Sequence, residues 1–114
     1  MRQTRPVSWL TPARKAFEEF PEAARETCLD ALTVAAEGGK AGIAKPMKGL
    51  GSGVFEVALP FQGNAFRVIY AVQLGEELWV IHSFQKKSMR GIKTPKHEIA
   101  LVRERMKRLK EMLK

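Results

Sequence analysis

The residues best suited to chemistry in this sequence are basic. Arg67 lies within a segment rich in β-forming residues, and the next such segment ends in Lys86 and Lys87. If these segments are consecutive antiparallel strands, the start of one lies beside the end of the other, so all three cations share one end of a sheet. Clustered Lys and Arg attract polyanions such as RNA or DNA. Hairpin geometry places Lys48 at the other end, unless its Gly-rich loop folds back.

Other kinds of catalytic chemistry lack their residues. The two histidines, His82 and His97, have no partner at metal-ligand spacing, so we expect neither a metal nor another cofactor. We expect His82 to be hydrogen-bonded and partly buried, and His97 to face solvent. The single Cys28 falls on the apolar stripe of a predicted helix, which favours a small core residue over a nucleophile. Residues 45–53 lack the Walker pattern and lead into a strand, so a nucleotide-binding loop is not supported.

The N-terminal third predicts one short strand and two helices. Residues 5–9 alternate weakly, and their proline places a strand there at a sheet edge. Thr11 followed by Pro12 is typical of a helix start, and this helix is expected to run to about residue 19. A second helix begins near Pro21 and ends at Gly38.

The rest of the chain predicts a sheet and a last helix. Three segments rich in Val, Ile and aromatic residues, 54–59, 66–72 and 78–84, are separated by short turns containing glycine and should pair antiparallel. Thr94-Pro95 then begins an amphipathic helix with apolar residues three and four apart. The predicted fold is α+β, with two N-terminal helices, a three- to four-stranded antiparallel sheet and a C-terminal amphipathic helix. A chain of 114 residues should form one domain, over 1–114.

Charge is unevenly distributed along the chain. Residues 1–83 hold nine basic and nine acidic side chains, whereas residues 84–114 hold eleven and three, so the net charge of +8 comes from the last part of the chain. Such a distribution favours a polyanionic partner. No apolar run approaches the roughly 18 residues of a membrane-spanning helix, and the N-terminus lacks a secretory signal pattern. We therefore expect a cytoplasmic protein without a membrane partner.

Four ordered segments resemble the RelE/ParE toxin superfamily, most closely its phage-derived HigB-like branch. They are KPMKGLGSGVFE at 45–56, FRVIY at 66–70, IHSFQKK at 81–87, and Thr94-Pro95 with the helix that follows. The resemblance implies a RelE-like fold and the toxin of a type II toxin–antitoxin system. Its implied activity is that of an mRNA interferase, a metal-independent and ribosome-dependent endoribonuclease in which the substrate 2′-hydroxyl attacks the adjacent phosphate.

The same resemblance implies roles for individual basic residues. Arg67 would stabilise the negative charge that develops on the phosphate, because its planar donor fork fits phosphate oxygens. Lys86 and Lys87 would act as general base or acid, since neighbouring cations lower the pKa of a lysine. Lys48 would bind phosphate or otherwise support the same catalytic site. Further RNA-binding positions are expected at Lys45, Arg90, Lys93 and Lys96.

Two departures from the family pattern bear on activity. Relatives usually have a basic residue where this chain has Ala58, and some have a glutamate general base where this chain has Lys45. The resemblance also implies partners: a cognate antitoxin, HigA-like with a helix-turn-helix, in a hetero-oligomer with the toxin, and the small ribosomal subunit with its mRNA. Three alternatives stay open: a ParE-like inhibitor of DNA gyrase, a basic nucleic-acid-binding module, and a degenerate, weakly toxic homologue.

Overall fold

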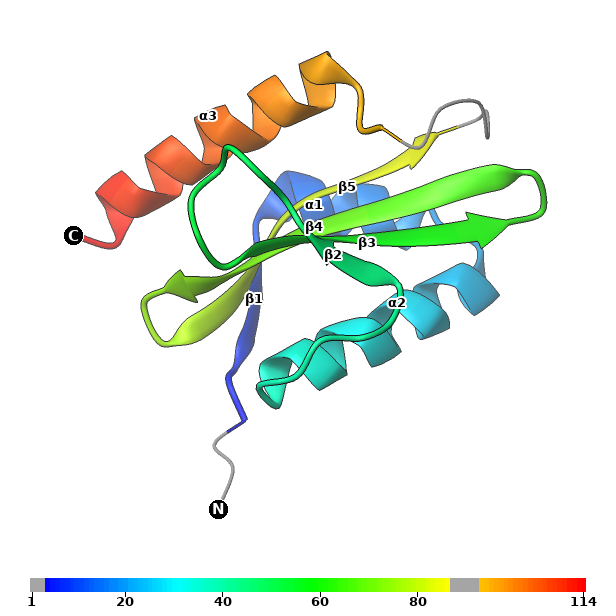
Figure 1. Ribbon diagram of the computed structural model, residues 1–114, viewed down its shortest axis with the longest axis horizontal. Coiled ribbons are helices and arrows are strands. Elements are labelled where there is room, and N and C mark those ends of the chain that lie inside the picture. The colour runs from blue at the N-terminus through cyan, green and yellow to red at the C-terminus, as the bar shows by residue number, and fades with distance from the viewer. Residues whose placement is uncertain (1–3, 87–92) are drawn as a thin grey trace.

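The computed structural model describes residues 4–86 and 93–114, which form one mixed sheet between helices (Figure 1). The elements are, in chain order, β1 (Val7–Trp9), α1 (Thr11–Glu18), α2 (Glu22–Ala36), β2 (Ala44–Pro46), β3 (Val54–Phe61), β4 (Asn64–Leu74), β5 (Glu77–Lys86) and α3 (Lys96–Met112). The order of strands across the sheet is β1-β5-β4-β3-β2. The three long strands pair antiparallel, as the short turns between them require.

Strand alternation divides the core into two layers, one on each face of the sheet. In β4, Phe66, Val68 and Tyr70 pack against α1 and α2, whereas Ile69 and Ala71 face α3. Figure 1 shows α2 and α3 on opposite sides of the sheet. Because alternate residues of a strand point to opposite faces, Arg67 lies on the α3 face.

A β-bulge in β5 changes which of its residues face α3. Ile69 of β4 pairs with His82, but Tyr70 pairs with Val80, so Ile81 is an extra residue in the ladder. Before the bulge Trp79 packs in the α3 layer, and after it Phe84 does, two residues beyond His82. The bulge therefore brings His82 and Lys86 onto the same face as Arg67.

The predicted α+β class and the order of helices and long strands are confirmed. The sheet has five strands and not the expected three or four, with two short edge strands beside the three long ones. One is β1, where a strand was expected at an edge; it pairs parallel with β5. The other is β2, which lies within the stretch expected to be a loop and pairs antiparallel with β3. Three residues of edge strand carry too little periodicity to be recognised in a stretch rich in glycine and proline.

Cys28 occupies the core position that its spacing predicted. It is fully buried in α2, and burial raises the pKa of its thiol to about 11. A thiol with so high a pKa forms little of the reactive thiolate at neutral pH.

In the part of the chain that the structure describes, no helix is long and apolar enough to cross a membrane.

Candidate active site

Arg67 forms a buried ion pair with Glu56. Its Nη1 donates a hydrogen bond to Oε1 of Glu56 over 3.0 Å, and the two side chains are only 7% and 10% exposed. Both come from the α3 face, since Arg67 pairs with Ala58, two residues from Glu56 along β3. A charged pair so far from water is held by hydrogen bonds in a fixed geometry.

Thr94 ties this ion pair to the start of α3. Its hydroxyl donates to the other carboxylate oxygen of Glu56 over 2.5 Å, and Nη1 of Arg67 lies 3.5 Å from the same hydroxyl. Thr94 stands two residues before the first residue of α3, Lys96. One end of the sheet and the beginning of α3 are thus joined through a single carboxylate.

Lys86 lies on the same face and at the same end of the sheet as Arg67. Arg67 pairs with Phe84, and Lys86 is the next residue of β5 on that face. Its half-buried ammonium donates to the backbone carbonyl of Lys93 over 3.2 Å. Lys93 and Lys96 are exposed beside this contact. The expected grouping of Arg67 with the end of β5 is therefore present.

The other predicted positions are more widely spread. Lys45 in β2 is exposed and pairs with Glu56, so it too stands on the Arg67 face. Lys48 is exposed in the loop between β2 and β3. This loop rejoins the sheet at Val54, which is four residues, or about 13 Å, along β3 from Ala58, the residue that pairs with Arg67. The loop approaches α3 instead, where Arg103 donates to the carbonyl of Gly49 over 3.4 Å. Lys87 and Arg90 lie outside the described residues.

A second polar cluster, centred on His82, fastens β5 to α3. Nη1 of Arg105 donates to the carbonyl of Ile81 over 3.0 Å and lies 2.9 Å from Nδ1 of His82. Because an arginine only donates, Nδ1 must accept, and Nε2–H then donates to Glu98 over 3.1 Å. Burial lowers the pKa of His82, although the hydrogen bond to Glu98 opposes this. His82 is buried and hydrogen-bonded, as predicted, whereas His97 is 80% exposed.

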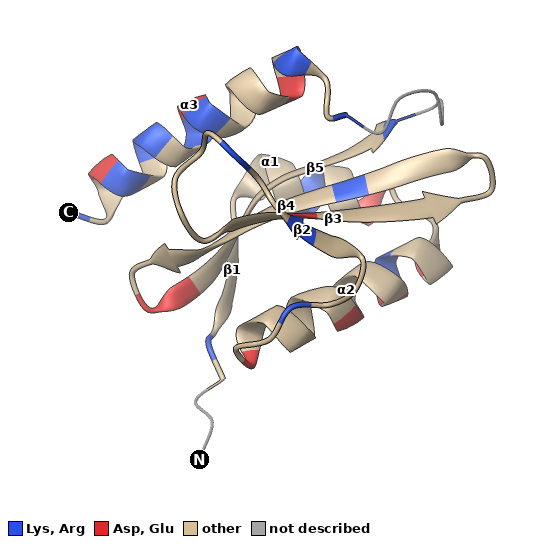
Figure 2. Cartoon of the chain, viewed as in Figure 1, with Lys and Arg blue, Asp and Glu red and all other residues tan. Residues whose placement is uncertain are grey.

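This arrangement can hold an anion and position donors around it. Arg67 and Lys86 bring two basic side chains to one sheet end, and Lys93 and Lys96 are exposed on either side of Thr94. Figure 2 shows further Lys and Arg positions, coloured blue, along α3. Across the described residues, no group of three His, Cys, Asp or Glu side chains could hold a metal ion. Basic side chains such as Arg67 and Lys86 are of the kind that can bind phosphate oxygens.

Comparison with known families identifies the chain. The family model described as "Phage derived protein Gp49-like" matches residues 15–107. The chain belongs to this Gp49-like family. No curated protein sequence matches it significantly.

Two solved structures share the fold of this Gp49-like chain. A double mutant of the Escherichia coli toxin RelE, in the free state, superposes with a TM-score of 0.64 at 15% identity, covering 92% of this chain and 97% of RelE. The toxin–antitoxin complex RelBE2 of Mycobacterium tuberculosis gives a TM-score of 0.52 at 13% identity, covering 77% of this chain and 98% of the other. The expected RelE-like fold is confirmed.

Sequence reasoning missed the side chains that hold Arg67 and His82 in place. Glu56 and Thr94 hold Arg67, and Glu98 and Arg105 hold His82. A signal for Glu56 was present, because a carboxylate between apolar residues on the buried face of a strand needs a basic partner. Nothing in local sequence could show that Thr94 or Arg105 would reach these positions from α3 and its approach.

Proposed function

We propose that this Gp49-like chain is the toxin of a toxin–antitoxin pair and that it cleaves mRNA on the ribosome. The observation that carries the proposal is the buried, hydrogen-bonded Arg67 next to Lys86, on the end of a RelE-like sheet. The ribosomal A site would present the mRNA strand to this end. The basic excess in residues 84–114 suits both mRNA and ribosomal RNA.

The chemistry requires no metal. The 2′-hydroxyl of the substrate loses its proton to a base and its oxygen attacks the adjacent phosphorus in line. The bond from phosphorus to the 5′-oxygen breaks and that oxygen takes up a proton, which leaves a 2′,3′-cyclic phosphate and a 5′-hydroxyl. Arg67 would stabilise the charge on the phosphoryl oxygens, and its five N–H donors allow it to keep Glu56 while doing so.

Glu56 is a positioning residue in this proposal. Its carboxylate fixes the guanidinium of Arg67 at one side of the site, and its second oxygen is fixed in turn by Thr94. Lys86 would supply or accept a proton, because the carbonyl of Lys93 holds its ammonium at the same sheet end as Arg67. The RNA backbone would be bound by Lys45, Arg90, Lys93 and Lys96, with a phosphate further along the strand at Lys48. Lys87 would share the proton transfer proposed for Lys86.

A reconstituted translation system tests the proposal. Wild-type protein should produce cuts in a translated message that primer extension places at the A site. Arg67→Lys keeps the charge of the buried pair but loses the donor fork, so cutting should slow by about 100-fold. Lys15→Gln, on exposed α1 across the sheet, removes a charge elsewhere and should cut at the wild-type rate. A wild-type protein that cuts neither translated nor naked RNA would refute the proposal.

An antitoxin partner belongs to the same proposal. The similar fold of RelBE2 comes from a toxin–antitoxin complex, and we propose a small HigA-like protein with a helix-turn-helix as the partner here. Expression of the chain should arrest growth, and co-expression of a neighbouring gene for such a protein should restore it. Growth arrest that no neighbouring gene relieves would contradict the pairing.

The buried ion pair also favours a second candidate, a non-enzymatic binder. If Arg67 only holds the fold together, a ParE-like inhibitor of DNA gyrase or a nucleic-acid-binding module would act through the basic side chains of α3 instead. A supercoiling assay separates the gyrase version. In this second case Lys107→Gln and Lys110→Gln abolish function, and Lys86→Gln leaves it intact.

A further inference from the structure

A cleft separates the Gly-rich loop from the middle of α3, on the same sheet face as Arg67 but toward the other end of β3. Its volume is about 300 Å³, and a second hollow of about 290 Å³ continues it under the loop. Leu50, Gly51, Met106 and Lys110 line both hollows, so they form one groove along α3. The proposed active site uses none of these residues.

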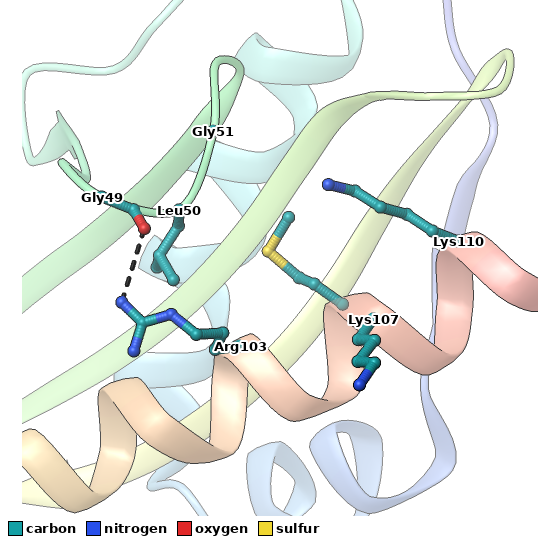
Figure 3. A pocket seen from close by; sticks show the side chains of 7 residues that line it. Gly49, Leu50, Gly51, Arg103, Lys107 and Lys110 are labelled. Atoms are coloured by element: carbon teal, nitrogen blue, oxygen red, sulfur yellow. Dashed lines mark hydrogen bonds between the residues drawn. The ribbon is translucent and has the colours of Figure 1, made fainter.

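Three basic side chains from one face of α3 line this groove. Arg103, Lys107 and Lys110 are four and three residues apart, which places them in a row along the helix. In Figure 3, Arg103 reaches toward Gly49, Lys110 extends from α3 toward the sheet, and Lys107 points away from the loop at the outer rim. The groove therefore has cations at both ends of its helical wall.

Acidic side chains do not neutralise this row within the described residues. Each glutamate of α3 contacts a basic partner elsewhere: Glu98 contacts His82, Glu104 contacts Arg108, and Glu111 contacts Lys114. No Asp or Glu of the described chain lines either hollow. The glutamates of α3 are thus paired with basic side chains outside this row, and no acidic side chain that the structure describes pairs with the basic residues that line the groove.

The opposite wall is formed by the Gly-rich loop, in which Gly49, Leu50 and Gly51 line the groove. Gly49 and Gly51 have φ values of 82° and 90°, a region that favours glycine, and a Cβ on Gly51 would meet nothing within 4 Å. Leu50 and Met106 in the floor are only 6% and 5% exposed. Small anionic groups that approach backbone and cations suit this lining.

We propose that this groove binds the phosphodiester backbone of a nucleic-acid strand. Arg103 and Lys110 would contact phosphate oxygens from the helical wall, and Lys107 would contact a further phosphate at the rim. The inference does not require Arg67 to be catalytic. If the chain does cleave mRNA, the groove would hold RNA beyond the scissile phosphate, since it opens on the same face.

Salt dependence of binding tests the groove. The probe is a fluorescein-labelled, single-stranded 12-nucleotide oligouridylate, and anisotropy gives its Kd between 50 and 200 mM NaCl. Two lost phosphate contacts should lower the salt slope of Lys107→Gln/Lys110→Gln by about 1.4. The advantage of wild type over this variant should then shrink about sevenfold across that range. Arg14→Gln/Lys15→Gln removes two exposed charges from α1, across the sheet, and should keep the wild-type slope.

Four outcomes overturn the inference. One is a groove variant with the same slope as wild type, and another is an α1 control that loses as much slope as the groove variant. The third is displacement of the oligouridylate by a 12-residue polyglutamate at equal concentration, which would assign the groove to an acidic protein segment. An oligothymidylate of the same length should bind with the same salt slope, because the basic side chains of the groove would contact phosphate groups, which RNA and DNA share. Binding of the DNA strand with no salt dependence would refute the inference. Cleavage assays report on Arg67 separately.

Discussion

Removing one partner of the Arg67–Glu56 pair should destabilise the protein strongly. The Nη1–Oε1 distance of the pair is 3.0 Å and its side chains are 7% and 10% exposed, so Glu56→Gln removes the charge of Glu56 from beside a buried guanidinium. Such a loss costs about 3 kcal/mol. A domain of this size unfolds with about 5–15 kcal/mol, so the variant should still fold at 25 °C. Its Tm should fall by about 12 °C, at about 4 °C per kcal/mol.

Urea unfolding at pH 7, followed by circular dichroism, measures this cost. Glu56→Met/Arg67→Met replaces both charges by apolar side chains and should lie within about 1 kcal/mol of wild type, well above either single variant. That rescue is the signature of a pair removed from water. The reasoning fails if Glu56→Gln loses less than about 1 kcal/mol, as an exposed pair would, or if the double variant loses the sum of the single ones.

Three further predictions follow from the described residues. Burial lowers the pKa of His82, so the unfolded chain takes up a proton that the native chain does not, and the free energy of unfolding should fall as pH drops below about 6.5. Urea titrations should show that this free energy depends less on pH in His82→Gln than in wild type, but not in exposed His97→Gln. The same pH dependence in His82→Gln and wild type would contradict the role given to His82. Cys28, with its pKa raised to about 11, should react with a thiol reagent at pH 8 only after unfolding, and rapid labelling of native protein would be inconsistent with its burial. Ala58 pairs with Arg67, so Ala58→Arg should add a cation beside Arg67 and raise the rate of RNA cleavage about tenfold. That factor corresponds to about 1.5 kcal/mol from one charged hydrogen bond. An unchanged cleavage rate would argue against a phosphate at this position.

Local sequence patterns predicted the elements and one part of the site. Short turns between three β-rich segments dictate antiparallel pairing, and that pairing alone places Arg67 near the end of β5. The spacing of apolar residues in 94–114 likewise predicted α3, which spans Lys96–Met112. These features depend on residues a few positions apart, so periodicity and turn chemistry are enough to find them.

Long-range contacts could not be predicted in the same way. Thr94 meets Glu56 and Arg105 meets His82 only because α3 crosses the sheet at a particular angle and position. The bulge at Ile81 also reverses the alternation of β5, which no regular strand pattern would show. The Gly-rich loop follows its own course toward Arg103 and not toward Arg67. Tertiary packing decides each of these features, and the pattern of nearby residues does not record it.

The chemistry of the RNA ends produced during translation tests the nuclease proposal most directly. Purified protein is added to a reconstituted translation system, and the 3′ ends of the cleaved message are analysed by mass spectrometry beside those from Arg67→Lys. We predict 2′,3′-cyclic phosphate ends at the A-site codon, formed about 100-fold more slowly by the variant. Cuts that end in 3′-hydroxyl groups, or equal rates for the two proteins, would contradict phosphate activation by Arg67.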